Sequence, residues 1–143
     1  MPRPKIVPEL FCSDFTRTVR FYRDFLGFAV RYDRPDERFA YLDLHGAELM
    51  IEQTVDPTRT FLAGELQYPF GRGIHLQIEV DDADALYARV LAAESRIFLP
   101  LEDRWYQIGE REESGNRQFV VSDPDGYLLR FWHDMGTRVV VTL

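Results

Sequence analysis

The chain has 143 residues, 45% hydrophobic and 14% aromatic, which suits one domain with a hydrophobic core and is too little for two. Its net charge of −7, from 24 acidic and 17 basic residues without a basic cluster, disfavours nucleic acid as a partner. No apolar run approaches the roughly 20 residues of a membrane-spanning helix, and no secretory signal follows Met1. With Cys12 as its only cysteine, expected to be a small core residue, the chain is predicted to be cytoplasmic and free of disulfides and membrane contacts.

The first half of the chain predicts one strand, one helix and three further strands. A strand over 5–12 leads to Asp14 or Ser13 as the helix N-cap, and Gly27 ends the helix as a C′ residue. The apolar face of this helix repeats at spacings of three and four residues, through Phe15, Val19, Tyr22 and Leu26. The further strands are predicted over 28–33, 39–44 and 47–54.

The second half repeats this order after an irregular linker over 55–72, in which one helical turn is expected at 61–65. A strand over 74–80 is followed by a helix that Asp81 or Asp82 caps and that continues to about Ser95. Two short strands, over 97–99 and 105–108, then precede the clearest hairpin of the chain. The loop residues around 110–113 are expected to be solvated.

This hairpin is formed by two short strands on either side of Asp123-Pro124-Asp125-Gly126, a sequence typical of a tight turn. In the second strand, over 127–132, Arg130 lies between apolar neighbours and shares a face with Leu128 and Trp132. A half-buried guanidinium is costly without a carboxylate partner. The sequence therefore predicts either such a partner for Arg130 or a side chain that extends outward to solvent.

Two βαβββ modules predict an α+β fold in which curved mixed sheets enclose a cavity, filled by side chains or by a ligand. The predicted boundaries of this single domain, 1–143, are 5–54 for the first module, 55–72 for the linker, 73–134 for the second module and 135–143 for a C-terminal tail.

Three segments of the sequence resemble the vicinal oxygen chelate superfamily of glyoxalase I, extradiol dioxygenases and fosfomycin- and bleomycin-resistance proteins. The segments 7–14 and 21–28 are similar to its opening strand and helix, and 117–131 is similar to its closing hairpin. The opening Val-Pro-Glu-Leu and the closing Leu-Leu-Arg-Phe are most similar to the bleomycin-resistance-like branch. The resemblance implies the glyoxalase/bleomycin resistance/dioxygenase fold and a homodimer whose paired chains complete each cleft.

The resemblance also implies four positions at which the superfamily's metal enzymes place ligands. They fall here at Val7, Glu52, His75 and Arg130. Valine cannot bind a metal and arginine repels one, so the expected metal is none, with Glu52 and His75 as weak candidates. Our hypothesis is that Arg130 occupies the place of the metal, paired with Glu52 or Glu9 and joined by His75.

Strand alternation places polar and aromatic side chains on the faces that are expected to line the cavity. The predicted ligand-binding residues are Glu9, Phe39, Met50, Glu52, His75, Gln77, Trp105, Tyr106, Arg130 and Trp132. Tyr41, Tyr68 and Phe70 are further aromatic candidates. Such a cavity suits planar, amphipathic or cationic ligands. His45 and His133 are expected on the surface.

The sequence favours a metal-independent protein that binds a small molecule, such as an antibiotic or another amphipathic cation, and sequesters it without a cofactor or a catalytic residue. The alternative is a metal-dependent enzyme of the same superfamily, a glyoxalase-type lyase or an extradiol-type dioxygenase. It would use zinc, nickel, manganese or iron, with Glu9 in place of Val7. A third possibility is a diverged member of the superfamily, in which side chains fill the cavity. Resemblance of fold does not name the ligand.

Overall fold

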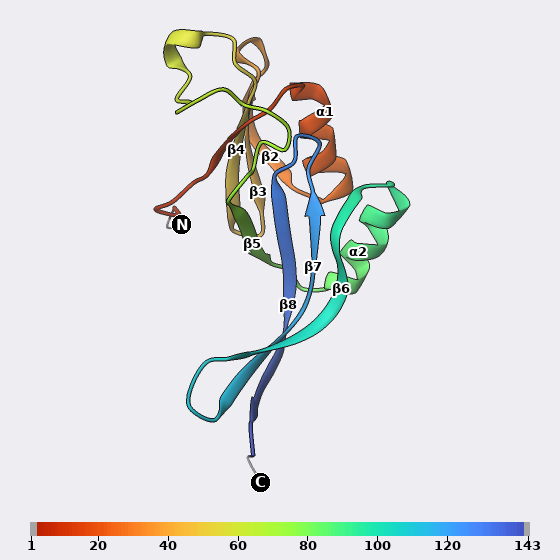
Figure 1. Ribbon diagram of the computed structural model, residues 1–143. Coiled ribbons are helices and arrows are strands. Elements are labelled where there is room, and N and C mark those ends of the chain that lie inside the picture. Colours follow the sequence, from red (N-terminus) through yellow and green to blue (C-terminus); the bar gives the residue numbers. More distant parts are fainter. Residues whose placement is uncertain (1–2, 142–143) are drawn as a thin grey trace. The chain divides into compact units, whose positions relative to one another are not determined.

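The structure is a computed structural model that describes residues 3–141. Its contacts divide the chain into two compact units. The first comprises the chain up to Arg72 together with Pro124–Gly126, and the second comprises Gly73–Asp123 and the chain from Tyr127 onward. Each unit holds one four-stranded mixed sheet and one α-helix in the order βαβββ, so the predicted α+β fold class is confirmed (Figure 1).

The sheet of the first unit has the strand order β1-β4-β3-β2. Its strands are β1 (Glu9–Phe11), β2 (Ala29–Arg34), β3 (Phe39–Leu44) and β4 (Ala47–Glu52). β1 runs parallel to β4, and the other neighbours are antiparallel. The predicted positions of these strands are confirmed, although β1 is much shorter than the predicted strand over 5–12.

Helix α1 (Phe15–Arg20) begins where its N-cap was predicted, because the Asp14 carboxylate accepts a hydrogen bond of 3.1 Å from the backbone amide of Arg17. The helix widens into a π-helical turn, Phe21–Phe25, and Gly27 follows with a φ of +89°. That φ is costly for any residue with a Cβ, which explains the stop at this glycine.

The core of the first unit lies between α1 and one face of its sheet, and the opposite face carries the polar side chains. The buried apolar residues include Val19, Tyr22, Leu26, Phe28, Ala40, Leu42, Leu49 and Ile51. Along β3 and β4 these residues alternate with Phe39, Tyr41, Met50 and Glu52. Register pairs Phe39 with Glu52 and Tyr41 with Met50, so these four side chains share the open face.

The segment between the two modules is irregular, as predicted, but its helical turn lies elsewhere. A single 3₁₀ turn covers Pro57–Arg59, where Asp56 accepts hydrogen bonds from the backbone and hydroxyl of Thr58. The prediction of a turn at 61–65 was wrong. Asp56 caps the turn and Pro57 presets its φ, and the segment 61–65 has neither an Asp nor a Pro for these roles.

The sheet of the second unit has the strand order β5-β8-β7-β6. Its strands are β5 (His75–Glu79), β6 (Arg96–Gln107), β7 (Glu112–Ser122) and β8 (Leu128–Val139). Helix α2 (Ala83–Ala92) is capped by Asp82, whose carboxylate accepts from the amide of Ala85. The core between α2 and the sheet includes Ile78, Leu86, Val90, Phe119, Val121, Leu129 and Phe131.

Three elements of the second unit are longer than the sequence predicted. The two short strands before the hairpin form one strand, β6, with irregularities after Ile97 and Leu99. β7 begins at Glu112, inside the predicted solvated loop, and β8 continues to Val139, through most of the predicted tail. The cause is pairing: Glu112 lies opposite Val139, so each polar strand end is held by the other. Figure 1 shows these ends as a curved ribbon that extends beyond α2.

The turn between β7 and β8 has the predicted residues and contacts segments of the first unit. Asp125 is 3% exposed and accepts hydrogen bonds from the amide (3.0 Å) and hydroxyl (2.5 Å) of Ser13. Its backbone carbonyl accepts from the amide of Phe70 at 2.8 Å. The Asp-Pro-Asp-Gly sequence therefore forms the turn and also holds two distant segments to it.

Cys12 is buried in the core, as expected for a small core residue. Within residues 3–141 there is no helix with the length and apolar character needed to cross a membrane.

Candidate functional site

A groove of about 640 Å³ lies on the open face of the first sheet and joins four of the predicted ligand-binding residues. Glu9, Phe39, Met50 and Glu52 all line it. The remaining lining residues, which the sequence reasoning did not select, are Tyr32, Arg34, Glu37, Val55, Asp56, Arg59 and Phe61. Strands β1 to β4 form the floor, and the irregular segment after β4 supplies the last four residues.

Strand register explains why these side chains meet. Glu9 on β1 lies opposite Met50 on β4, and Glu52 lies one pleat further along the same face of β4. Phe39 on β3 lies opposite Glu52 on one side and opposite Arg34 of β2 on the other. The result is a row of carboxylate, aromatic ring and guanidinium across four strands.

Glu9 and Glu52 form a hydrogen-bonded carboxyl pair at the floor of this groove. The hydrogen bond with Glu9 is the largest cause that raises the pKa of Glu52, to about 7, followed by burial and by the negative charge of Glu9. The charge of Arg34 acts in the opposite direction and that of Glu37 adds slightly to the rise. Near neutral pH Glu52 is therefore only partly ionised, and it gains its negative charge as the pH rises through about 7.

This carboxyl pair predicts that stability falls as the pH rises through neutrality. Glu52 holds its proton more tightly in the folded chain, so its stabilising effect is complete below its usual pKa of 4.5 and is lost as pH passes about 7. Because both carboxyls are half-buried and screened by solvent, we expect a fall of about 1 kcal/mol between about pH 5 and about pH 8. Urea unfolding of wild type and Glu52→Gln across this range measures the difference.

The control for that experiment is Glu65→Gln, which removes a carboxylate from an exposed position outside the groove. We expect Glu65→Gln to follow the wild-type profile and Glu52→Gln to flatten it. Parallel profiles for wild type and Glu52→Gln would show that the carboxyl pair is not coupled to folding.

Aromatic rings and guanidinium groups line the same groove as the carboxyl pair. The Arg34 guanidinium lies 4.0 Å from the ring centroid of Phe39, and its Nε donates to Glu37 at 2.5 Å. The Arg59 guanidinium lies 5.2 Å from the ring of Phe61. Two rings of the groove therefore already carry a cation of the chain itself against their faces.

A second hollow, of about 710 Å³, adjoins this groove at Tyr32, which lines both. The rings of Tyr32 and Tyr41 stack with centroids 5.1 Å apart and an interplanar angle of 17°. The Tyr41 hydroxyl donates to Glu48 at 3.0 Å, and Arg31 forms a salt bridge with the same carboxylate. Tyr41 therefore lies on the same open face of the first sheet as Tyr32.

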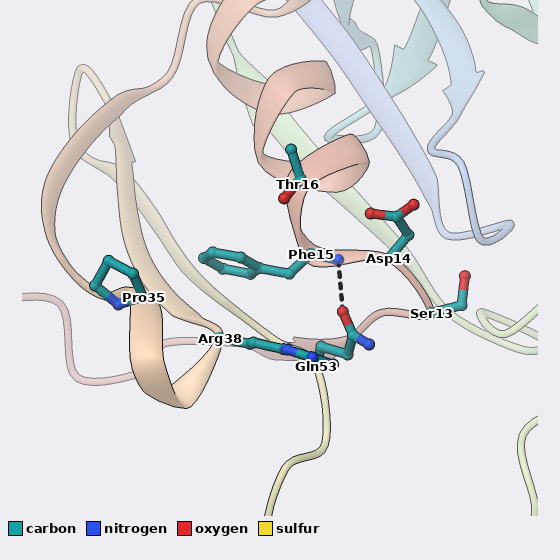
Figure 2. A pocket seen from close by; sticks show the side chains of 7 residues that line it. All are labelled: Ser13, Asp14, Phe15, Thr16, Pro35, Arg38 and Gln53. Atoms are coloured by element: carbon teal, nitrogen blue, oxygen red, sulfur yellow. Dashed lines mark hydrogen bonds between the residues drawn. The ribbon is translucent and has the colours of Figure 1, made fainter.

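A third hollow of the first unit lies at the start of α1 and is shown in Figure 2. The Gln53 side chain points toward the backbone of Phe15 and accepts its amide hydrogen bond at 2.8 Å. Asp14 caps the helix, and Ser13 donates to Asp125. These polar groups serve the local fold, and we assign no ligand to this hollow.

The second unit presents its own polar face, on the side of the sheet opposite α2. In the pairing of β5 with β8, Gln77 lies opposite Arg130 and His75 lies opposite Leu128. The side chains of His75 and Gln77 are exposed. The Arg130 guanidinium donates to the amide oxygen of Gln77. The predicted pairing of Arg130 with Glu52 or Glu9 joins different units and stays a prediction, as does the role of His75.

The two aromatic residues predicted on β6 lie on opposite faces of the strand, because they are consecutive. The Tyr106 hydroxyl accepts a hydrogen bond of 2.7 Å from Gln118, so Tyr106 lies on the face with Arg130. The Trp105 ring packs over Gly115, and the Arg138 guanidinium lies 4.1 Å from its centroid. Trp132 pairs with Glu79 and Gln118 on the polar face.

Comparison with known proteins places this geometry in a family. The model of the Glyoxalase/Bleomycin resistance protein/Dioxygenase superfamily matches residues 6–131. The chain belongs to this superfamily. A search of curated proteins found no significant match.

Several solved structures are similar to this chain. TioX from Micromonospora sp. ML1 is 28% identical, with a TM-score of 0.71 over 91% of this chain and 98% of that one. A protein of unknown function from Agrobacterium tumefaciens str. C58 is 26% identical, with a TM-score of 0.68 over 93% and 95%. A superfamily member from Vibrio splendidus 12B01 is 43% identical over 90% and 97%, with a TM-score of 0.41.

The residues at the superfamily's metal positions do not fit a metal ion. Val7 has no donor atom, and Arg130 places a positive charge, bonded to Gln77, where a carboxylate is needed. Glu52 is bonded to Glu9 on the first sheet, which leaves His75 as the remaining ligand type. We derive no chemical step through a metal from this set.

Asp82, Asp84 and His133 bring one ligand atom each to within 4.8 Å of one another. Their atoms already serve α2 and its surroundings: Asp82 caps the helix, Asp84 accepts from Arg117 at 3.3 Å, and His133 Nδ1 accepts from the amide of Ala83 at 2.8 Å. The expectation that His133 is a surface residue was therefore wrong, because it is half-buried against the start of α2. His45 is exposed, as expected.

Sequence reasoning missed Tyr32, Arg34 and Gln118. The alternation of Tyr32 and Arg34 along β2 marks one face, but a bulge between Val30 and Tyr32 changes the parity within the strand. Gln118 lies inside the hairpin motif as an isolated polar residue beside Phe119. Only its burial, at 1% exposure, marks it as unusual.

Proposed function

We propose that this protein binds a small, cationic, aromatic molecule in the groove on the open face of its first sheet and acts by sequestering it. The observation that carries the proposal is that the Glu9–Glu52 carboxyl pair and the rings of Phe39 and Tyr32 line one groove. Carboxylates supply charge, and rings supply a stacking surface and a negative quadrupole. An amphipathic cationic antibiotic has both features.

Charge and volume support this assignment. The net charge of −7 attracts a cation over the whole surface, and a groove of about 640 Å³ is within the usual range for small-molecule sites. Sequestration needs only affinity and abundance, so no catalytic residue or cofactor is required. We further propose a cytoplasmic homodimer, which light scattering of the purified chain tests directly.

The proposal predicts selectivity between two ligands that differ in charge alone. At about pH 8 we expect the permanent cation 10-methylacridinium to bind about tenfold more tightly than neutral acridine, because both ionised carboxylates face it. The advantage should shrink toward about pH 5, as the pair takes up its proton. Fluorescence titration of both ligands across this range measures the two affinities.

The matched variants are Tyr32→Ala in the groove and Phe98→Ala on β6, both of which remove an exposed ring. Tyr32→Ala removes the stacking surface and should weaken the binding of 10-methylacridinium severalfold. Phe98→Ala should leave the affinity for this ligand unchanged. Equal affinities for the cation and neutral acridine at about pH 8 would contradict the proposal.

The second candidate is a metal-dependent enzyme, which one observation favours: two carboxylates meet at one point of the groove. Oxygen ligands of this kind suit manganese or magnesium. Calorimetric titration with zinc, nickel, manganese and iron(II) distinguishes the candidates. Sub-micromolar binding that is lost in Glu52→Ala would favour the enzyme and direct attention to lyase and dioxygenase substrates.

A further inference from the structure

The second hollow of the first unit, about 710 Å³ in volume, contains hydrogen-bond donors that the fold itself does not use. Arg3 and His45 both line this hollow, and both side chains are exposed. Among the residues that the structure describes, 3–141, neither side chain has an ion-pair or hydrogen-bond partner. Their N–H groups therefore remain available to a ligand that enters the hollow.

The two carboxylates that line the same hollow are already engaged by the chain. Glu48 forms a salt bridge with Arg31, accepts a hydrogen bond of 3.0 Å from the Tyr41 hydroxyl, and has a side chain that is only 7% exposed. Asp43 accepts from the backbone amide three residues later at 2.8 Å, and its carboxylate lies 3.9 Å from the Arg31 guanidinium. Both negative charges are therefore compensated locally, and the charge that has no partner in the hollow is the positive charge of Arg3.

Strand register places this hollow and the acidic groove at opposite ends of one sheet face. The open face of β4 carries Glu52 in the groove, then Met50, then Glu48 in the second hollow, so the two ends lie two pleats, or about 13 Å, apart. Tyr32 lies between these ends, because it is paired with Tyr41, which lies opposite Met50. The Tyr32 side chain is 51% exposed and lines both hollows, so a planar group stacked on its ring can reach either one.

From this arrangement we infer that the ligand is a zwitterion, a planar aromatic cation that carries an anionic group such as a carboxylate on an arm. Its cationic ring would stack on Tyr32 beside the carboxyl pair, and its arm would carry the anion to Arg3 and His45. A guanidinium binds a carboxylate through two parallel hydrogen bonds, and an imidazole N–H adds a third. The cationic end rests on the function proposed above, and the anionic end is added by the second hollow.

Two ligands that differ only at the end of the arm test the anionic site on the whole chain. The zwitterion is 10-(5-carboxypentyl)acridinium, and 10-(5-carbamoylpentyl)acridinium ends in a neutral amide of nearly equal shape. In fluorescence titrations at about pH 8 we expect the carboxylate to bind about tenfold more tightly than the amide. The net charge of −7 favours the amide, which stays cationic overall, so a preference for the carboxylate requires a local site for the anion.

The variant Arg3→Gln removes the unpaired positive charge of the second hollow and should reduce the preference for the carboxylate to less than about threefold. Arg89→Gln, at an exposed position on α2 outside both hollows, is the matched control and should keep the wild-type preference. Equal affinities for the two ligands, or a full preference in Arg3→Gln, would overturn the anionic site even if 10-methylacridinium binds. If 10-methylacridinium itself does not bind, the proposed function is wrong and the zwitterionic ligand is excluded with it.

Discussion

The substitution Gly126→Ala is expected to remove about 3 kcal/mol from the free energy of unfolding. Gly126 has a φ of +90°, which costs a residue with a Cβ about 1 to 2 kcal/mol. A Cβ there would also lie 2.6 Å from the Cα of Pro69 and closer still to its Cβ. The turn or the segment 69–71 must then move, although Phe70 and Gly71 donate hydrogen bonds to Asp125 and Gly126.

Gly136→Ala is the matched control, because Gly136 has nearly the same φ, +88°, and open space where the Cβ would be. We expect it to lose only about 1 kcal/mol, from backbone strain alone. Urea unfolding followed by circular dichroism gives both values. If the two variants lose the same amount, the close approach of Pro69 has no energetic effect and only the backbone conformation requires glycine at Gly126.

The double variant Glu9→Gln and Glu52→Gln is expected to weaken binding of 10-methylacridinium at about pH 8 by about a hundredfold, or about 2.7 kcal/mol. Two glutamines retain the shape of the pair and can still hydrogen-bond to each other, so the groove keeps its form. What is lost is the attraction of two carboxylates that line the same groove as the rings of Phe39 and Tyr32. Fluorescence titration gives the affinity.

Glu65→Gln combined with Glu110→Gln is the control, since it changes the net charge by the same amount at two exposed positions outside the groove. We expect it to weaken binding less than threefold, through the long-range field alone. Equal losses in both double variants would mean that the ligand responds to the overall charge of the protein and does not occupy the groove.

Most of the fold could be predicted because its signals are local. Asp14 and Asp82 cap the two helices, and the alternation in β3 and the Asp-Pro-Asp-Gly turn placed their elements correctly. The ends of β6, β7 and β8 could not be predicted, because their polar residues lack alternation and are held only by pairing with one another.

The candidate site was predictable only in part. Glu9, Phe39, Met50 and Glu52 were selected by strand parity, and the structure confirms that they line one groove. Parity could not show that Glu9 raises the pKa of Glu52, since that depends on the parallel register of β1 and β4. Nor could it show the stack of Tyr32 on Tyr41, because the bulge in β2 shifts the alternation.

By itself, the sequence determined the class of fold and the order of the two modules, because these follow from spacing and residue type. Only the tertiary structure decided which side chains act together. The raised pKa of Glu52 beside Glu9 and the burial of polar atoms of Arg130 and Gln118 arise from register and packing. Both depend on contacts between distant segments, which change pKa values and remove water from polar groups.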